Sequence, residues 1–268
     1  MERRTFIKSL AIGGAALAAS GGYFEHSNRF AVASLEMDVF GGLKEPLRIC
    51  LISDFHAPSY TFRLDKLTQA VNSFHPDFIF ATGDIIDDTG NEPLIRRLFS
   101  GMKVKGGKYS ILGNWEYWSN ADLNLLDAYY RQAGFELLVN KTVELSYRGQ
   151  DLRITGLDDW IAGKPDYKLL EDAGGNTAIN IVLVHCPAAF DTIKDISGRA
   201  SLTLSGHTHG GQIAPFGAMI FRPPGCGAYT KGLYRQGSRA LYVSAGLGNI
   251  LLPFRIGSRP ELCLLTVR

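Results

Sequence analysis

The sequence lacks an excess of charge of either sign, closely spaced cysteines and a long hydrophobic run. Its 28 basic and 26 acidic residues leave a net charge of +2, which gives no basic footprint for a nucleic-acid partner and no charged tail. The cysteines (Cys50, Cys186, Cys226 and Cys263) are scattered, without a Cys-x-x-Cys pair. This spacing argues against a disulfide framework or a thiolate zinc site, so we expect at least three of the four to be small, buried apolar side chains.

Internal repeats and interdomain linkers are also absent, which favours a single domain. A chain of 268 residues with 46% hydrophobic composition can bury the core of one large α/β domain. Its 30 glycines are expected where many short elements are joined by tight turns. We therefore predict one folded domain over residues 34–268, preceded by a targeting segment over residues 1–33.

The targeting segment begins with Arg3-Arg4 and continues with an uncharged, Ala/Gly-rich stretch over residues 9–20. About a dozen apolar residues are too few for a comfortable membrane span, which needs about 20. The pattern resembles a twin-arginine export signal, a pathway for already folded proteins. An uncleaved signal anchor is the alternative. Residues 16–18 form a plausible cleavage site, whereas cleavage at residues 31–33 would trim the first predicted strand.

Strands and helices alternate along the rest of the chain. Near-continuous apolar runs, typical of strands buried on both faces, are predicted at residues 47–53, 78–81, 108–112, 179–184 and 202–205. Further strands are predicted at residues 33–39, 240–244 and 262–267, with two or three short antiparallel ones between 135 and 155. Helical spacing predicts helices over residues 61–74, 92–101 and 121–133, the last capped by Asn120. A Gly/Pro-rich loop is expected over about residues 215–232.

Residues of metal-ligand type follow five of these strands. They are Asp54 and His56, then Asp84, then Asn114, then His185, and finally His207 and His209 within Gly-His-Thr-His-Gly. Functional groups of open α/β sheets gather beyond the carboxyl ends of the strands, so we expect all seven side chains to meet. Seven mixed oxygen and nitrogen donors are too many for one catalytic zinc. They fit two divalent metals about 3.5–4 Å apart, such as Mn²⁺, Fe or Zn²⁺.

The order of these residues closely resembles the calcineurin-like metallophosphoesterases, whose pattern D-x-H, G-D, G-N-H-[DE], H and G-H-x-H runs through residues 34–268. The resemblance implies a four-layer α/β/β/α sandwich and hydrolysis by a metal-bridging hydroxide. It also implies that Asp54, His56 and His209 hold one metal and that Asn114, His185 and His207 hold the other. Asp84 would bridge the two metals, and Asp87 would support the site from behind.

One residue departs from that pattern, because Trp115 stands where the family has a histidine that contacts the phosphate and protonates the leaving group. An indole can donate a hydrogen bond but cannot deliver a proton near neutral pH. Trp115 and Trp118 could stack on a nucleobase, a sugar or an acyl chain, or they could simply pack beside the metals. Glu116 is an alternative source of the proton. His26 and His75 lie outside the pattern and are expected to be surface or turn residues.

The predicted function is hydrolysis of a phosphodiester, phosphomonoester or diphosphate in a phosphorylated small molecule or lipid. The stretches 206–212 and 241–248 resemble a subgroup of exported or membrane-associated bacterial phosphoesterases. One alternative is a membrane-bound UDP-2,3-diacylglucosamine diphosphatase of lipid A synthesis, which an anchor facing the cytoplasm would favour. Another is a non-hydrolytic metal-binding relative that lost its acid at Trp115. Export through the twin-arginine machinery would place the enzyme in the periplasm or on the extracytoplasmic face of the inner membrane, where a membrane surface is an expected partner.

Overall fold

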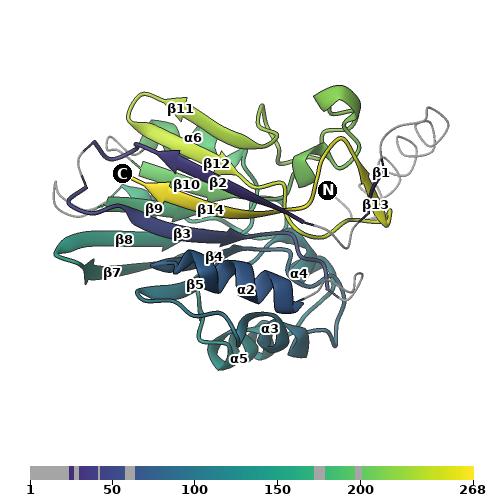
Figure 1. Cartoon of the computed structure of the whole chain (residues 1–268), viewed down its shortest axis with the longest axis horizontal. Coiled ribbons are helices and arrows are strands. Elements are labelled where there is room, and N and C mark those ends of the chain that lie inside the picture. Colours follow the sequence, from purple (N-terminus) through teal and green to yellow (C-terminus); the bar gives the residue numbers. More distant parts are fainter. Residues whose placement is uncertain (1–23, 27–29, 42, 58–63, 172–178, 197–200) are drawn as a thin grey trace.

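A computed structural model describes residues 24–26, 30–41, 43–57, 64–171, 179–196 and 201–268. Two six-stranded sheets dominate these residues (Figure 1). Within the described part, none of the helices combines the length and hydropathy that crossing a bilayer requires.

The first sheet has the order β2-β14-β3-β4-β5-β6. Strands β3, β4, β5 and β6 run parallel, β14 is antiparallel to β3, and β2 is parallel to β14. The bounds of these strands are β2 Ala31–Met37, β14 Glu261–Val267, β3 Leu47–Ile52, β4 Phe78–Thr82, β5 Gly107–Ile111 and β6 Glu136–Leu137. The parallel strands therefore all end at one edge of the sheet.

The second sheet has the order β11-β12-β10-β9-β8-β7. Its four central strands are parallel, and an antiparallel strand flanks them on each side. The bounds are β11 Gly232–Gln236, β12 Arg239–Val243, β10 Ser201–Ser205, β9 Ile179–Leu183, β8 Gln150–Gly156 and β7 Lys141–Tyr147. A small separate ladder joins β1 (Phe24–His26) to β13 (Phe254–Ile256).

The two sheets face each other across one large apolar cluster, and helices cover both outer faces. On the first sheet lie α2 (Leu64–Phe74), α3 (Pro93–Phe99) and α5 (Leu123–Gln132), which Figure 1 shows gathered on one side. On the second sheet lie α6 (Ala189–Ile196) and the short 3-10 helix η1 (Tyr167–Leu170). This arrangement is the predicted α/β/β/α sandwich.

The sequence of β3 explains why it lies in the middle of these layers. Ile49 and Leu51 point into the cluster between the sheets, whereas Cys50 and Ile52 point into the cluster beneath the helices. Successive side chains of a strand alternate between its two faces, so a strand covered on both sides must be apolar throughout. At roughly 25 cal/mol per Å² of buried apolar surface, such strands contribute much of the folding free energy.

The predicted elements are present, and their described boundaries lie within two residues of the predicted ones. Of the strands predicted to be antiparallel between residues 135 and 155, β7 and β8 pair in that way, whereas β6 is parallel to β5. The clearest correction concerns α5, which begins at Leu123 rather than residue 121. Its N-cap is Asp122, whose carboxylate accepts hydrogen bonds from the backbone N–H groups of Asn124 and Leu125. The predicted cap, Asn120, instead adopts a φ of 54°, in the turn before the helix. Strands β1, β11 and β13 and helices α4 (Asn114–Trp118) and α6 were not anticipated, and residues 61–63 of the predicted first helix lie outside the described residues.

The N-terminal part of the described chain is tied to the sandwich before residue 34. Strand β2 begins at Ala31, and β1 pairs with β13. Cleavage at residues 31–33 would cut into β2, whereas cleavage at residues 16–18 would leave both strands whole. The rest of the predicted targeting segment, residues 1–23 and 27–29, lies outside the described residues.

Candidate metal centre

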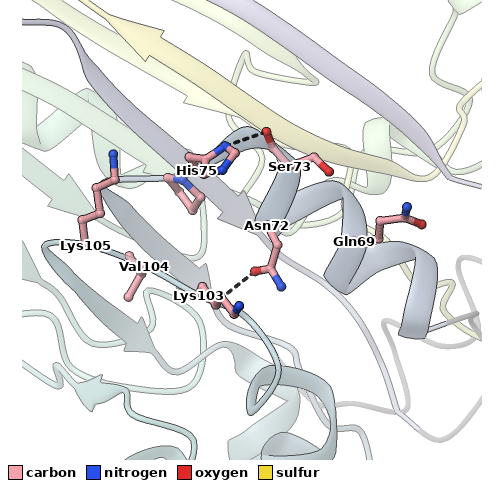
Figure 2. Close-up of a pocket in the computed structure, with 8 residues that line it drawn as sticks. Gln69, Asn72, Ser73, His75, Lys103, Val104 and Lys105 are labelled. Atoms are coloured by element: carbon pink, nitrogen blue, oxygen red, sulfur yellow. Dashed lines mark hydrogen bonds between the residues drawn. The ribbon is translucent and has the colours of Figure 1, made fainter.

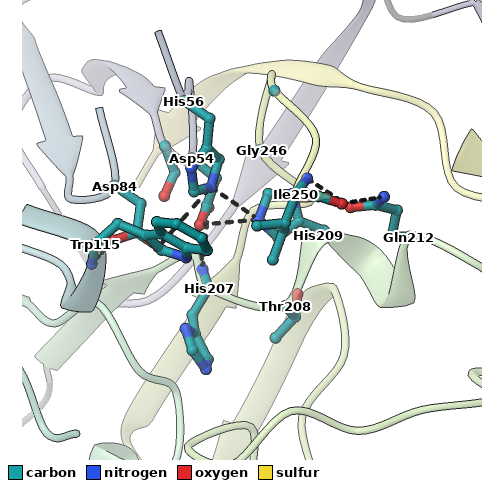
Figure 3. Close-up of polar contacts among 12 residues, drawn as sticks. Asp54, His56, Asp84, Trp115, His207, Thr208, His209, Gln212, Gly246 and Ile250 are labelled. Atoms are coloured by element: carbon teal, nitrogen blue, oxygen red, sulfur yellow. Dashed lines mark hydrogen bonds and ion pairs between the residues drawn. The ribbon is translucent and has the colours of Figure 1, made fainter. Parts of the chain in front are cut away.

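The seven predicted ligands meet at the edge where the parallel strands of both sheets end. All seven are buried, with at most 2% of the side-chain surface exposed. Six of them form two groups in which three potential ligand atoms lie within 4.8 Å of one another. We call them the Asp54 group (Asp54, His56 and His209) and the Asp84 group (Asp84, His185 and His207). Figure 3 labels the Asp54 group together with Asp84 and His207.

The inner atoms of the two groups lie close enough to share a ligand. In the Asp54 group, Nε2 of His56 lies 3.1 Å from Nε2 of His209, which lies 3.7 Å from the Asp54 carboxylate. In the Asp84 group, Nε2 of His185 lies 3.0 Å from the Asp84 carboxylate and 3.2 Å from Nδ1 of His207. The same Asp84 oxygen, Oδ2, lies 3.9 Å from Nε2 of His56. Asp84 therefore stands between the two groups.

Backbone carbonyls orient both imidazoles of the Asp84 group. Nδ1 of His185 donates to the Thr82 carbonyl at 2.7 Å, and Nε2 of His207 donates to the Pro224 carbonyl at 2.7 Å. A proton held on the outer nitrogen leaves the lone pair of the inner nitrogen available for a metal. His185 would thus bind through Nε2, and His207 through Nδ1.

His209 in the Asp54 group is held by a charged residue, Arg255, which is fully buried. The Arg255 guanidinium donates to the carbonyl of His209 at 3.1 Å, and its Nη2 lies 3.1 Å from Nδ1 of the same histidine. It also donates to the carbonyls of Ala245, Gly246 and Gly248. One side chain therefore joins the Gly-His-Thr-His-Gly loop to the loop after β12.

Close approach of the backbone explains the glycine before His207. Both oxygens of Asp54 accept a hydrogen bond from the His207 backbone N–H at 3.0 Å. A Cβ atom on Gly206 would collide with the side chains of Ser53 and Asp54. Gly113 plays the same part before Asn114, because a Cβ there would collide with the Asp84 carboxylate.

Asn114 provides the test of whether a metal fits this site. It begins α4 (Asn114–Trp118) and is completely buried, yet neither its Oδ1 nor its Nδ2 has a hydrogen-bond partner among the described residues. Leaving such a group unsatisfied costs about 1–3 kcal/mol. An amide oxygen is a good ligand for hard divalent cations, so a metal bound to this oxygen would meet part of that cost. The donor set therefore fits divalent metals.

The backbone at the site is strained in a repeated way. Five of the seven predicted ligands have a positive φ: Asp54, His56, Asp84, His207 and His209, with values from 49° to 72°. This left-handed region is uncommon for residues other than glycine and costs of order 1–3 kcal/mol each. Packing around both sheets must supply that free energy, because nothing local favours the conformation.

Burial and mutual proximity shift the pKa values of these ligands. Burial raises the pKa of Asp84 to about 7, against the opposing effect of His185. Burial also opposes a charged His185, but the Asp84 carboxylate outweighs it and raises the His185 pKa well above its ordinary value. Burial and His185 lower the pKa of His207 to about 3. Burial likewise lowers the pKa values of His56 and His209, which leaves these three imidazoles in the neutral form that metals bind.

Glu116 faces the protein rather than the space between the ligand groups. Its carboxylate accepts hydrogen bonds from the backbone N–H groups of Asp84, Ile85, Ile86 and Gly113, at 2.7 to 3.4 Å. Burial raises its pKa, and these N–H groups act in the opposite direction. Glu116 therefore positions the loop that carries Asp84, and Asp87 lies half-buried three residues farther along it.

Trp115 lies beside the Asp54 group, in the place that sequence comparison predicts. Its ring meets His56 edge-on at 5.6 Å and Trp118 at 5.7 Å between centroids. With Ile250 and Phe221, the two tryptophans form a small apolar cluster (Figure 3 labels Trp115 and Ile250). The backbone N–H of Trp115 donates to Asp84 at 2.8 Å. The indole thus packs beside the candidate ligands, and its backbone helps to hold one of them.

Comparison with known proteins decides the family. The model of the calcineurin-like phosphoesterase family matches residues 47–211. The chain belongs to this family. It is therefore a metal-dependent phosphoester hydrolase, as predicted, and the donor set above supports divalent metals.

Two relatives illustrate the range of similar proteins. The uncharacterized metallophosphoesterase YkuE of Bacillus subtilis is 35% identical and covers 100% of this chain and 98% of its own length. A transmembrane protein with metallophosphoesterase domain from Danio rerio is 31% identical, over 81% of this chain and 52% of its own length.

A solved structure supports the fold. The sulfate thiohydrolase SoxB of Thermus thermophilus has a TM-score of 0.53 with 11% identity, and the match covers 84% of this chain and 57% of SoxB. At this identity the likeness bears on the fold alone. It agrees with the four-layer sandwich.

Two residues at the site were not anticipated as functional. Arg255 interrupts an otherwise apolar stretch over residues 250–256, and a charged residue in such a setting is seldom fully buried without a specific role. Gln212 was noted only as part of a motif. Its side chain accepts from the Ile250 backbone N–H at 3.0 Å and donates to the Ile250 carbonyl at 2.9 Å. A buried side chain with these bonds fixes the loop after β12.

The opposite edge of the first sheet is built differently. A cavity of about 470 Å³ lies there, between the end of α2 and the segment before β5 (Figure 2). Asn72 ties its walls together by accepting from the Lys103 backbone N–H at 2.7 Å. His75, an exposed turn residue as predicted, also lines it. No predicted ligand lies at this edge.

Proposed function

We propose that this protein hydrolyses a phosphodiester, phosphomonoester or diphosphate with two divalent metals, one held by each ligand group. The position of Asp84 carries the proposal, since one of its oxygens approaches histidines of both groups. Asn114 would join His185 and His207 at the second metal. Mn²⁺, Fe and Zn²⁺ all suit this donor set.

The residues of the chain hold and orient the reacting groups. The carbonyls of Thr82 and Pro224 fix which nitrogen His185 and His207 present. Burial of the ligands keeps bulk water away, which strengthens every electrostatic contact. When bound, the divalent metals would supply charge neutralisation for the phosphate and lower the pKa of water.

The absence of a histidine at Trp115 predicts which substrates are handled well. General acid catalysis contributes about 10²–10⁴-fold and matters most for strongly basic leaving groups. Glu116 is bound to four backbone N–H groups and fully buried, so it does not replace that acid in this arrangement. We expect good turnover of diphosphates and aryl esters, whose leaving groups are weakly basic, and poor turnover of simple alkyl diesters.

The experiment begins with the full chain stripped of metal and reloaded separately with Mn²⁺, Fe²⁺ or Zn²⁺. Two equivalents of metal and turnover of an aryl phosphodiester are expected. One equivalent, or activity that ignores metal loading, would contradict the dinuclear proposal.

A second experiment compares methyl, phenyl and nitrophenyl phosphodiesters in the wild type and in Trp115→His. The wild-type rate should depend steeply on the pKa of the leaving group, and Trp115→His should flatten the dependence by accelerating the alkyl ester. Trp118→His is the matched control and should keep the steep slope. Equal slopes for the wild type and Trp115→His would refute the role assigned to position 115.

We also propose export in folded form, from the Arg3-Arg4 pair and the short uncharged stretch after it. The double variant Arg3→Lys/Arg4→Lys should accumulate in the cytoplasm, because the export pathway reads the arginine pair. Unchanged extracytoplasmic accumulation would exclude this route.

A further inference from the structure

The large apolar side chains that are exposed in the described part of the chain are unevenly distributed. The most exposed is Phe216, which is completely accessible. The full set is Val32, Leu123, Leu125, Trp160, Phe216, Ile220 and Leu251. All seven lie at the edge of the sandwich that carries the candidate metal centre.

Topology establishes this placement. Trp160 follows β8, Phe216 and Ile220 follow β10, and Leu251 follows β12; these are parallel strands that end at the metal centre. Leu123 and Leu125 open α5, just after the α4 helix that begins with Asn114. Val32 pairs with Leu262, beside the carboxyl end of β3. Single exposed apolar residues are ordinary on a protein surface, but seven at one edge are not.

Three of these residues lie on two loops that are joined by hydrogen bonds, and we call them the apolar rim: Phe216, Ile220 and Leu251. Gln212 lies just before the loop that carries Phe216 and Ile220. Its side chain donates to the carbonyls of Ile250 and Leu252, on either side of Leu251, so it joins the two loops of the rim. Phe216 and Leu251 have φ values of 54° and 60°. Bulky residues rarely adopt this conformation, so the fold holds two apolar side chains outward at a cost.

The charge on the loops that carry the apolar rim has one sign. These loops, residues 206–231 and 244–260, have three exposed basic residues and no aspartate or glutamate. Arg222, Lys231 and Arg259 are exposed on the loops of this edge. Apolar side chains flanked by basic ones are the pattern of a surface that rests on anionic lipid.

The rim is also continuous with the apolar cluster at the site. Phe221 and Ile250 each neighbour a rim residue in sequence, and both pack with Trp115 and Trp118 beside His56. The surface that would touch a membrane is therefore built on the same side chains that flank the Asp54 group.

The N-terminal segment joins the molecule at the same place. Residues 9–20 are uncharged and rich in alanine and glycine. A few residues later the chain forms β1, which pairs with β13 at residues 254–256. That strand directly continues the loop that carries Leu251, so an apolar segment inserted in or passing through a membrane would bring the rim to the lipid.

We propose that the apolar rim docks on the surface of an anionic lipid bilayer, with the candidate metal centre facing the membrane. Basic residues attract the surface at about 1 kcal/mol each, and the three apolar side chains enter the interfacial region. If the proposed hydrolysis is correct, the enzyme would act on phosphate groups presented at that interface. Docking itself does not depend on catalysis.

A thiol-specific probe tests the contact directly in the full chain. The four native cysteines are buried, so a polarity-sensitive fluorophore will label Phe216→Cys selectively. The matched control is Ser238→Cys, in the exposed turn between β11 and β12 at the opposite edge. Adding vesicles that contain phosphatidylglycerol should shift the emission of the probe at position 216 to the blue. Brominated acyl chains should then quench it.

The probe at position 238 should not change under either condition. Equal responses at both positions, or none at position 216, would overturn the proposal, even if residues 9–20 held the protein on the vesicle. Because this readout follows fluorescence, failure of the hydrolysis proposal would leave it unaffected.

Partitioning measures the contribution of the rim. The variant Phe216→Ser/Ile220→Ser/Leu251→Ser should bind phosphatidylglycerol vesicles at least about tenfold more weakly than the wild type, because three large apolar side chains are lost. Circular dichroism should show an unchanged fold, and Leu123→Ser at the same edge but outside the rim is the control. Unchanged partitioning, or a change only in the oligomeric state, would refute lipid docking and point to a protein partner or a second copy of the chain.

Discussion

The two ligand groups resemble each other at their inner atoms and differ in what stands behind them. Behind the Asp84 group, the neutral carbonyls of Thr82 and Pro224 accept from the imidazoles. Behind the Asp54 group, the permanently charged guanidinium of Arg255 lies 3.1 Å from Nδ1 of His209. A carbonyl partner raises the basicity of a metal-binding histidine, whereas a nearby positive charge disfavours further positive charge on the imidazole. We therefore expect the two ligand groups to differ in metal affinity, with the group backed by Arg255 holding a metal less tightly.

The largest effect should come from removing the residue that the two groups share. Asp84→Ala should lose both metals, whereas Asp54→Ala should lose only the metal of its own group. Activity of Asp84→Ala should fall by about 10³-fold or more, because metals contribute several kcal/mol to the transition state. Metal analysis of both purified variants checks this, and Asp84→Ala protein that keeps two metals would rule out the shared role.

Arg255 should give the next largest effect, confined to one group. Arg255→Lys keeps the charge but cannot reproduce the fork of donors to His209 and the carbonyls of the adjoining loop. We expect the affinity for one metal to change by about 10–100-fold while the other is unaffected. Competition titration with a chelator resolves the two steps. Arg268→Lys, which alters an exposed ion pair with Glu36, is the control. Equal changes in the affinity for both metals would contradict the expected difference between the two ligand groups.

Glu116 should affect stability more than metal affinity. Glu116→Gln replaces a carboxylate that accepts four backbone N–H bonds by an amide with one acceptor oxygen. Charge-assisted hydrogen bonds contribute about 1.5–3 kcal/mol, so a clear fall in the free energy of unfolding is expected. Denaturant melts measure it, with Glu136→Gln as the control because Glu136 pairs with Lys141 on the surface. If the two variants lost the same free energy of unfolding, Glu116 would have no special positioning role.

The smallest effect is expected at the opposite edge of the sheet. Lys103→Ala/Lys105→Ala alters the lining of the 470 Å³ cavity but no residue near the ligands. Stability should change by no more than about 0.5 kcal/mol, and metal content and turnover should be unchanged. Loss of activity in this variant would mean that the cavity takes part in function and that the two edges of the sheet are functionally coupled.

The strands and the ligands at their ends were predictable because the signals are local. A run such as residues 47–52 is apolar at every position since both faces are covered, and Asp54 follows directly. Family resemblance added the pairing of ligands, because its motif retains their order. The short strands β1 and β13 have no such signal, since three residues carry too little periodicity and their pairing joins segments 228 or more residues apart.

The N-cap of α5 was predicted at the wrong residue. Asn120 and Asp122 are both good caps, and the sequence offered no reason to prefer the second. The preceding turn decided it, because Asn120 adopts a positive φ there. Which residue caps a helix therefore depends on the backbone conformation of the turn that precedes it.

Side-chain type and periodicities within a few residues were enough to predict the alternating strands and helices and the seven candidate ligands. The family resemblance added the four layers and the histidine that Trp115 replaces. Only the tertiary structure decided that Arg255 stands behind His209, that Glu116 is bound to backbone N–H groups, and that exposed apolar residues gather at one edge. Each of these depends on contacts between segments distant in the chain, and burial and distance exist only once the two sheets have packed.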